Sequence, residues 1–187
     1  MAGFAQQPYA VMISFRFSES LNEANALQDA LQARGHRTFV SNEAPGADLQ
    51  EAIATAMQQS QIQVLLATRT YGKKTNEQYS TYQEMNYALN HNSSFLVKMT
   101  DHPDSVWEEA STEMALTGRM YSYWAPSTPM PEDLVDKIVA KLNAIRAAKP
   151  VAAAVAAPAP AVASPDGSHD PIDQVADRAR GCHAASV

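Results

Sequence analysis

The sequence predicts an α/β domain: a doubly wound, flavodoxin-like parallel sheet of five strands with helices on both faces, followed by a disordered Ala/Pro-rich tail. Two observations lead to this class. Short apolar runs of strand length alternate with helical patterns, which implies right-handed strand–helix–strand crossovers. The run at 10–13 is also unbroken by polar residues, and the run at 62–67 is mostly apolar, as expected for strands buried on both faces of a parallel sheet.

The other elements follow the same alternation along the chain. Further strands are expected at 37–40, 95–99 and 120–124. The helices show apolar residues spaced for one buried stripe, most open on a capping residue, and Gly35 is expected to stop the first one. They are expected to begin at Ser20, Asp48, Thr81, Ser105 and Pro131. In the fourth helix the side chains expected to face inward are Val106, Trp107, Ala110 and Met114.

Composition narrows the class of protein. The chain has 187 residues, of which 45% are hydrophobic, and this suffices for one ordinary domain and an appendage. A net charge of −6 argues against nucleic acid as a partner, because binding phosphates needs Lys and Arg. No apolar run approaches the length of a membrane span. The single cysteine, Cys182, fits a reducing compartment, so a cytoplasmic protein without a membrane partner is expected.

The domain is expected to occupy residues 1–146, and residues 147–187 to form a disordered linker and tail. From 149 to 165 the chain is nearly all Ala, Val and Pro. The prolines prevent a stable helix, and such small side chains bury too little area to offset the entropy lost on ordering. An extended, polyproline-biased segment is the expectation.

Several common sites are excluded by the residues that are missing. The segment after the first strand, 14–19, contains no glycine, so neither a phosphate loop nor a dinucleotide fingerprint is available there. The five histidines are scattered without the spacing of zinc ligands, so no metal site is expected. Cys182 lies in the expected tail and is a poor candidate for a nucleophile.

The stretch from Gln61 to Asn90 holds the main candidate for chemistry. A strand and a polar loop lead into a helix whose first turn carries Glu84. The buried stripe of that helix is Tyr82, Met85 and Leu89, so the wheel turns Glu84 toward water or a cleft. One reading is a helix cap, because 81–84 has the form of a capping box. The other is a ligand-binding carboxylate, since open α/β sheets bind ligands beyond the carboxyl ends of their strands.

Loops after the first three strands should converge at that same edge of the sheet. They carry cations and aromatic rings, which suit the phosphates and rings of a nucleotide-like ligand. A solvated polar loop is the alternative for each residue alone. The residues concerned are Phe15, Arg16, Phe17, Asn42, Glu43, Arg69, Tyr71, Lys73, Lys74 and Tyr79.

Three boxes in this order resemble the Toll/interleukin-receptor (TIR) domain family, over about 9–146. Residues 9–16 resemble its first box, an apolar strand followed by Ser, an aromatic residue and Arg; 41–46 resemble its second, a loop that ends in Pro-Gly. Residues 80–84 fall where enzymatic members keep a catalytic glutamate. Departures are Ala10 for an acidic residue, Ser41-Asn42 for Arg-Asp, and Ser80-Thr81 for Trp-Cys.

The resemblance implies cleavage of NAD⁺, as substrate and not as cofactor, at its nicotinamide–ribose bond. The products would be nicotinamide and ADP-ribose or its cyclic form, in a signalling or defence role. Glu84 would be catalytic. Arg16 and Lys73 or Lys74 would hold pyrophosphate, and Phe15, Tyr71 or Tyr79 would stack on a ring. The full set of expected substrate contacts is Ser14, Phe15, Arg16, Asn42, Glu43, Tyr71, Lys73, Tyr79 and Ser80.

One carboxylate suffices for such a reaction. Nicotinamide leaves from a positively charged nitrogen and needs no protonation by a general acid. The two carboxyl groups of a usual glycosidase can therefore be reduced to one. That group holds the ribose and stabilises positive charge at the anomeric carbon.

The resemblance also implies a function of another class, a scaffold that acts by homotypic assembly with copies of itself or other TIR proteins. Assembly would use the sheet edges and the loop residues Ala44, Pro45, Gly46 and Asp48. A third reading is an enzyme similar to nucleoside deoxyribosyltransferases, which share the sheet plan and a carboxylate. Such an enzyme would act on free deoxynucleosides and ignore NAD⁺.

Overall fold

The structure, a computed structural model, describes residues 9–41, 47–74, 80–91 and 93–148, without the side chains of 47–49. The chain divides into one unit at 1–151 and another at 152–187, and the description concerns the first. The expected tail lies outside the described residues from 149 onward, so its disorder and the predicted boundary at 146 stay predictions.

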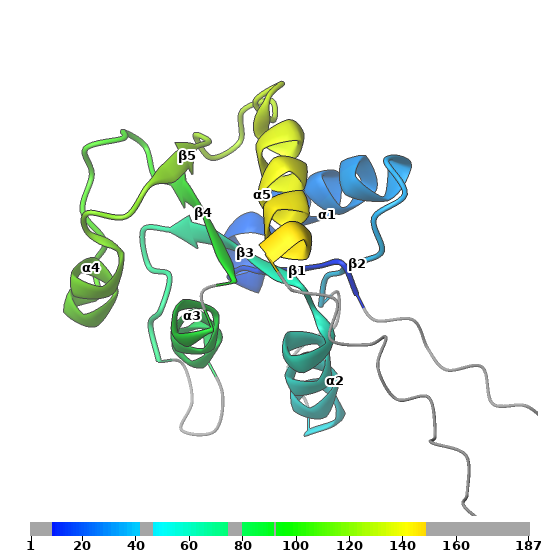
Figure 1. Cartoon of the computed structure of the whole chain (residues 1–187). Helices are drawn as coiled ribbons and strands as arrows, with labels where there is room; N and C mark the ends of the chain where they lie inside the picture. Colours follow the sequence, from blue (N-terminus) through cyan, green and yellow to red (C-terminus); the bar gives the residue numbers. More distant parts are fainter. Residues whose placement is uncertain (1–8, 42–46, 75–79, 92, 149–187) are drawn as a thin grey trace, which may run out of the picture. The chain divides into compact units, whose positions relative to one another are not determined.

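Strands and helices alternate along the described residues (Figure 1). The strands are β1 Val11–Ser14, β2 Thr38–Phe39, β3 Ile62–Thr68, β4 Ser94–Met99 and β5 Tyr121–Tyr123. The helices are α1 Phe17–Ala33, α2 Ala47–Gln59, α3 Thr81–Asn90, α4 Ala110–Leu116 and α5 Leu134–Ala148. The sheet has the order β2-β1-β3-β4-β5, and every neighbouring pair is parallel. The predicted doubly wound, flavodoxin-like sheet of five strands is confirmed.

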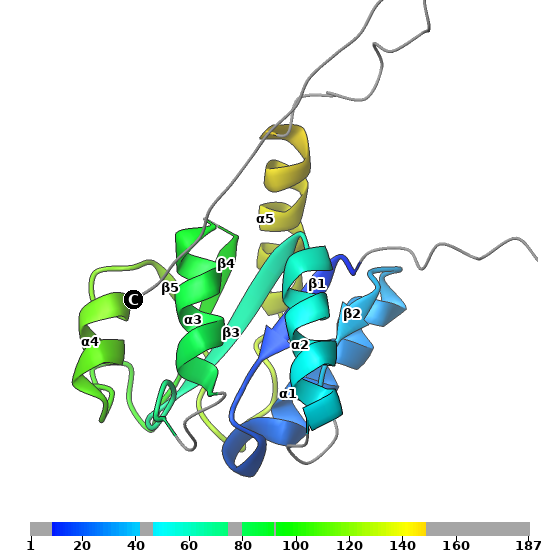
Figure 2. The ribbon, with the colours of Figure 1, turned by 90° about the horizontal axis from the view of Figure 1, so that it is seen from below.

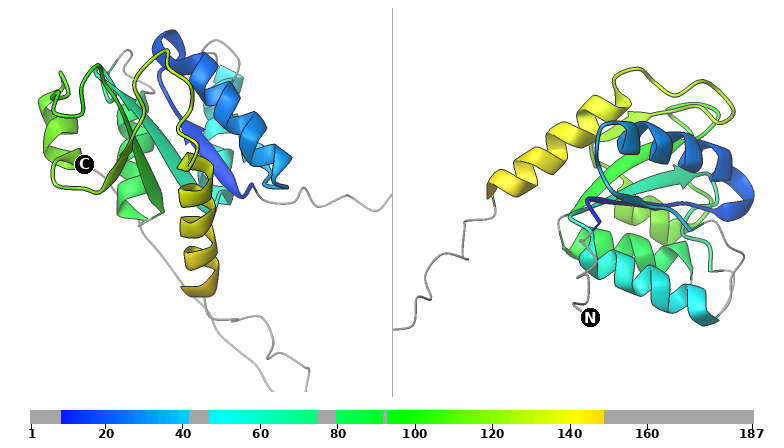
Figure 3. Two further views of the ribbon diagram at one scale, coloured as in Figure 1. Left: turned by 90° about the horizontal axis from the view of Figure 1, so that it is seen from above. Right: turned by 90° about the vertical axis from the view of Figure 1, so that its right-hand side faces the viewer.

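The central strand β3 is buried on both faces along its whole length, which explains its mostly apolar sequence. Its alternate side chains belong to different cores. Val64 and Leu66 pack on the side of α1 and α5, whereas Leu65 and Ala67 pack on the side of α3. Figure 3 shows α1 and α5 together on one face of the sheet, with α2 and α3 on the other.

The face covered by α2 and α3 is the one that positions the site (Figure 2). Met85 and Ala88 of α3 are fully buried against β3 and β4 residues, and Ile53 of α2 packs with Met12 of β1. Because Ser14 lies two residues after Met12 on β1, its side chain is turned to this same face.

Helix α1 begins three residues earlier than predicted, and its kink marks the predicted start. The helix runs from Phe17, but Ser20 has φ −146° and ψ 30°, outside the helical region. The Ser20 hydroxyl is buried and has no hydrogen-bond partner among the described residues, so the expected capping bond is not made. The predicted stop is confirmed, since Gly35 has φ +79° and its N–H bonds to Gln32 O, while His36 N bonds to Leu31 O.

Helix α4 is much shorter than predicted, and part of its expected inward face points outward. Residues 105–109 are not helical, because the Trp107 N–H donates to the Glu113 carboxylate at 2.9 Å and draws the chain into a loop. The indole is nevertheless buried, with the Lys98 ammonium 4.7 Å from its ring centre. Val106 and Met114 were expected inside but are 64% and 84% exposed.

Helix α5 begins at Leu134, three residues after the predicted Pro131. The Leu134 N–H bonds back to Pro131 O at 3.1 Å, so the proline lies in the turn that leads into the helix. The predicted apolar stripe is buried against β1, β3 and β4, through Leu134, Val135, Ile138 and Leu142.

Candidate functional site

The carboxyl ends of β1 and β3 are joined by a buried hydrogen bond. The Ser14 Oγ lies 2.5 Å from the Tyr71 hydroxyl oxygen, and the two residues are 57 positions apart in the chain. Ser14 is 2% exposed and Tyr71 is fully buried. The predicted convergence of the first and third loops is therefore present in the structure.

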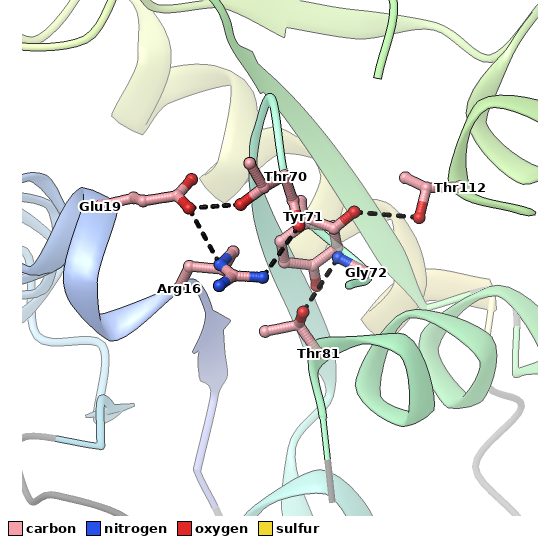
Figure 4. Close-up of polar contacts among 7 residues, drawn as sticks. All are labelled: Arg16, Glu19, Thr70, Tyr71, Gly72, Thr81 and Thr112. Atoms are coloured by element: carbon pink, nitrogen blue, oxygen red, sulfur yellow. Dashed lines mark hydrogen bonds and ion pairs between the residues drawn. The ribbon is translucent and has the colours of Figure 1, made fainter. Parts of the chain in front are cut away.

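A second link between these loops runs through Arg16 (Figure 4). Its Nη1 donates to the Thr70 carbonyl at 3.0 Å, and its Nε pairs with the Glu19 carboxylate at 3.0 Å. The Thr70 hydroxyl donates to the same Glu19 carboxylate. Two of the five N–H donors of Arg16 thus bind groups of the protein itself.

The first turn of α3 is tied to the loop after β3. Thr81 is the first residue of the helix, and its hydroxyl accepts the Gly72 N–H at 2.9 Å. The predicted capping box led by Thr81 is therefore wrong: Ser80 holds the N-cap position. Among the described residues Ser80 makes no side-chain cap bond, and its hydroxyl donates to the Gln83 side chain instead.

Glu84 lies in that first turn and is only 6% exposed. Of the two expectations from the helical wheel, water or a cleft, the exposed fraction excludes open water, because the side chain is packed inside the protein. Burial is the main cause that raises the pKa of Tyr71 well above its usual value, and the charge of Glu84 is the second. The Ser14 hydrogen bond lowers that pKa by a smaller amount. The phenol stays neutral, and the carboxylate stands close enough to act on it.

Two aromatic residues expected to stack on a ligand do not offer a ring face to one. Tyr71 is fully buried, and Phe15 is 8% exposed and packs in the core under α1 and α5. Lys73 is exposed as expected, and the Lys74 ammonium lies 4.8 Å from the ring centre of Tyr82. Outside the described residues lie Asn42, Glu43, Ala44, Pro45, Gly46, Tyr79 and the side chain of Asp48.

The structure adds three residues that the sequence did not single out. Glu19 and Thr70 complete the Arg16 link, and the Thr112 hydroxyl of α4 donates to Tyr71 O at 2.9 Å. The spacing of Arg16 and Glu19, three apart at a helix start, was the one sequence signal. Thr70 and Thr112 gave none, because their roles depend on the approach of segments distant in sequence.

The parallel sheet with the order β2-β1-β3-β4-β5 places the chain among flavodoxin-like α/β domains. The family model described as TIR domain matches residues 11–124, more than half of the chain. The chain therefore belongs to the TIR domain family, which includes enzymes that cleave NAD⁺ and signalling adaptors. A comparison with curated proteins found no match.

Two solved structures are similar to this chain. The TIR domain of the Toll-related receptor TRR-2 from Hydra magnipapillata is 20% identical, with a TM-score of 0.50, covering 74% of this chain and 98% of that one. A TIR-STING receptor from C. gigas, solved with 2′,3′-cGAMP, is 15% identical with a TM-score of 0.49. That match covers 72% of this chain and only 39% of the receptor.

Within the part of the chain that the structure describes, no helix has the length and apolar character needed to cross a membrane.

Proposed function

We propose that the chain is an NAD⁺ hydrolase that cleaves the nicotinamide–ribose bond, with Glu84 as its catalytic carboxylate and a signalling or defence role. The observation that carries the proposal is the burial of Glu84 in the first turn of α3, at the carboxyl edge of the sheet. A carboxylate held in a low-dielectric setting at the ligand-binding edge of an open α/β sheet is a candidate for a functional group. Membership of the TIR family supports the same reaction.

The chemistry needs one negative charge and a water molecule. The bond between the anomeric carbon and the nicotinamide nitrogen breaks, and its electron pair leaves with the nitrogen, which becomes neutral. Positive charge develops on the ribose, where the Glu84 carboxylate stabilises it more strongly than in water because the site is buried. Water then bonds to the anomeric carbon and loses a proton, giving ADP-ribose; attack by an adenine nitrogen instead gives the cyclic form.

Binding would draw on the residues that surround this edge. Arg16 keeps donors beyond those given to Thr70 and Glu19, and Lys73 is exposed, so both suit the pyrophosphate. Phe15 would line the site as part of its apolar wall and would not stack on a substrate ring, because its side chain is buried. Tyr79 would stack on a ring of the substrate. Asn42, Glu43 and Ser80 remain as expected contacts, whereas Ser14 and Tyr71 are left out because they are buried and bonded to each other.

Chromatography of the products formed from NAD⁺ tests the proposal. The full chain should release nicotinamide together with ADP-ribose or a cyclic form, and Glu84→Ala should stop the release while keeping the fold. The matched control is Glu108→Gln, since Glu108 is an exposed acid paired with Arg69 at 3.1 Å. No nicotinamide from the assembled wild-type protein, or equal release by Glu84→Ala, would refute the enzymatic function.

A scaffold function is the second candidate, and the edges of the sheet favour it. Strands β2 and β5 end the sheet; Tyr121, the first residue of β5, is 44% exposed, and Met120 just before it is 96% exposed. An exposed strand edge is a surface on which another chain can pair. Homotypic assembly with copies of itself or with other TIR proteins would then be the activity. In that case changing Pro45 or Gly46 abolishes assembly, and Glu84→Ala has no effect.

A further inference from the structure

Tyr71 was expected at the surface of the site, yet it is the most enclosed aromatic side chain in it. The phenol is fully buried, and its hydroxyl bonds to Ser14 Oγ at 2.5 Å. A residue without an exposed ring face touches no substrate. Its place in the site must therefore be explained by what it holds.

The backbone on either side of that ring is fastened at three points. Tyr71 N–H donates to Thr68 O at 3.0 Å, and Tyr71 O accepts the Thr112 hydroxyl of α4 at 2.9 Å. The next residue, Gly72, donates its N–H to Thr81 at the start of α3. Figure 4 shows Tyr71 and Gly72 between Thr81 and Thr112. The two residues form a strap between two helices.

Glu84 stands one helical turn after Thr81, on the same side of α3. The strap is therefore attached one turn before the carboxylate. The electrostatics agree with this short separation, since the charge of Glu84 raises the pKa of Tyr71. Burial also keeps the phenol neutral, so the strap adds no second negative charge beside Glu84.

We propose that Tyr71 is a positioning residue. Through its hydroxyl on Ser14 and its backbone strap on Thr81 and Thr112, it fixes the first turn of α3 against the end of β1 and so sets the place of Glu84. The effect on turnover rests on the proposed NAD⁺ hydrolysis, whereas the effect on α3 does not. Small displacements of a catalytic group are costly, because about 1 Å of misplacement can reduce a rate about a hundredfold.

The test compares Tyr71→Phe with Tyr123→Phe. Each substitution removes one hydroxyl; that of Tyr123, on β5, donates to Thr100 O at 2.7 Å, just after the end of β4. Amide hydrogen exchange is measured over 81–90, and kcat and KM for NAD⁺ are measured in the same full-length proteins. Tyr71→Phe should speed exchange of this segment at least about tenfold and lower kcat about tenfold to a hundredfold, with KM within about twofold. Tyr123→Phe should do neither.

Each result decides the inference. Exchange over 81–90 that matches wild type in Tyr71→Phe overturns it, whatever the activity. Faster exchange in a protein that releases no nicotinamide even as wild type supports the positioning role and refutes the proposed function. If Tyr71→Phe does not fold, Ser14→Ala removes the same bond from the other side and is judged by the same exchange measurement.

Discussion

Gly72 gives the sharpest stability prediction, because both its backbone and its surroundings require glycine. Its φ is +82°, a region that costs an L-residue about 1–2 kcal/mol. A Cβ at this position would overlap the Thr112 hydroxyl. Relief moves Thr112 away from Tyr71 O and leaves a buried carbonyl without that partner, at about 1–3 kcal/mol. Gly72→Ala should therefore lower the free energy of unfolding by about 2–5 kcal/mol.

The chain supplies a matched control for the backbone part. Gly118 has φ +78°, and a Cβ there meets nothing within 4 Å. Gly118→Ala should thus cost only the conformational part, about 1–2 kcal/mol. Urea unfolding at constant slope measures both variants. Equal losses in the two, within about 0.5 kcal/mol, would refute the close approach of Gly72 to Thr112.

A double substitution tests the same contact from its other side. Thr112→Ala removes the hydroxyl that the new Cβ of Gly72→Ala would overlap. In the double variant the Cβ at position 72 then meets only the Cβ of residue 112, at 3.2 Å. The two losses should therefore be less than additive, by about 1–2 kcal/mol, because both delete the same hydrogen bond. Strict additivity would show that the residues do not share it.

The stability of the protein should also depend on the ionisation of Tyr71 and on the side chains of its cores. Because the pKa of Tyr71 is raised in the folded state, its neutral form stabilises the protein fully below pH 10, and this stability is lost as pH rises above 10. In urea titrations Tyr71→Phe should lose less stability above pH 10 than wild type, and parallel pH profiles would contradict this. Leu27→Ala, at a fully buried position of α1, should cost about 2–5 kcal/mol in urea unfolding. Met114→Ala, at a residue 84% exposed, should stay within about 0.5 kcal/mol, and a loss matching that of Leu27→Ala would mean that Met114 is covered.

Much of the fold was predictable because local signals and burial agree. The apolar runs at 10–13 and 62–67 became the two neighbouring central strands β1 and β3. Gly35 stops α1 because a left-handed residue is needed there, and few residues other than glycine adopt one. The alternation of strands and helices was enough to give the sheet class, since parallel strands need crossovers.

The local predictions that were wrong concern residues whose conformation is set by tertiary contacts. Residues 105–109 carry a helical pattern, but a hydrogen bond from Trp107 N to Glu113, and the burial of the indole, form a loop instead. Thr81 looked like a cap, yet its hydroxyl is taken by Gly72, nine residues earlier. Tyr71, in a polar loop, was predicted to stack on a ring of the ligand. Its ring turns inward because Ser14, 57 residues away, supplies a buried partner for its hydroxyl.

For the candidate site, the sequence predicted the position of Glu84 in the fold but not the contacts around it. Glu84 was found from its place after the third strand, and the structure confirms that place while burying the side chain. The Arg16–Glu19–Thr70 link and the strap at Tyr71 and Gly72 need coordinates, because each joins segments whose separation in the chain carries no periodic signal.

Nicotinamide release by Glu84→Gln is the most direct measurement of the central claim. The amide is isosteric with the carboxylate but carries no charge, so packing in the first turn of α3 is kept while charge stabilisation is lost. With folding verified, and Glu108→Gln as the control, the rate should fall about 10²–10³-fold or more below wild type. A rate within about twofold of wild type would contradict the account, because it would show that the negative charge of Glu84 takes no part in cleaving NAD⁺.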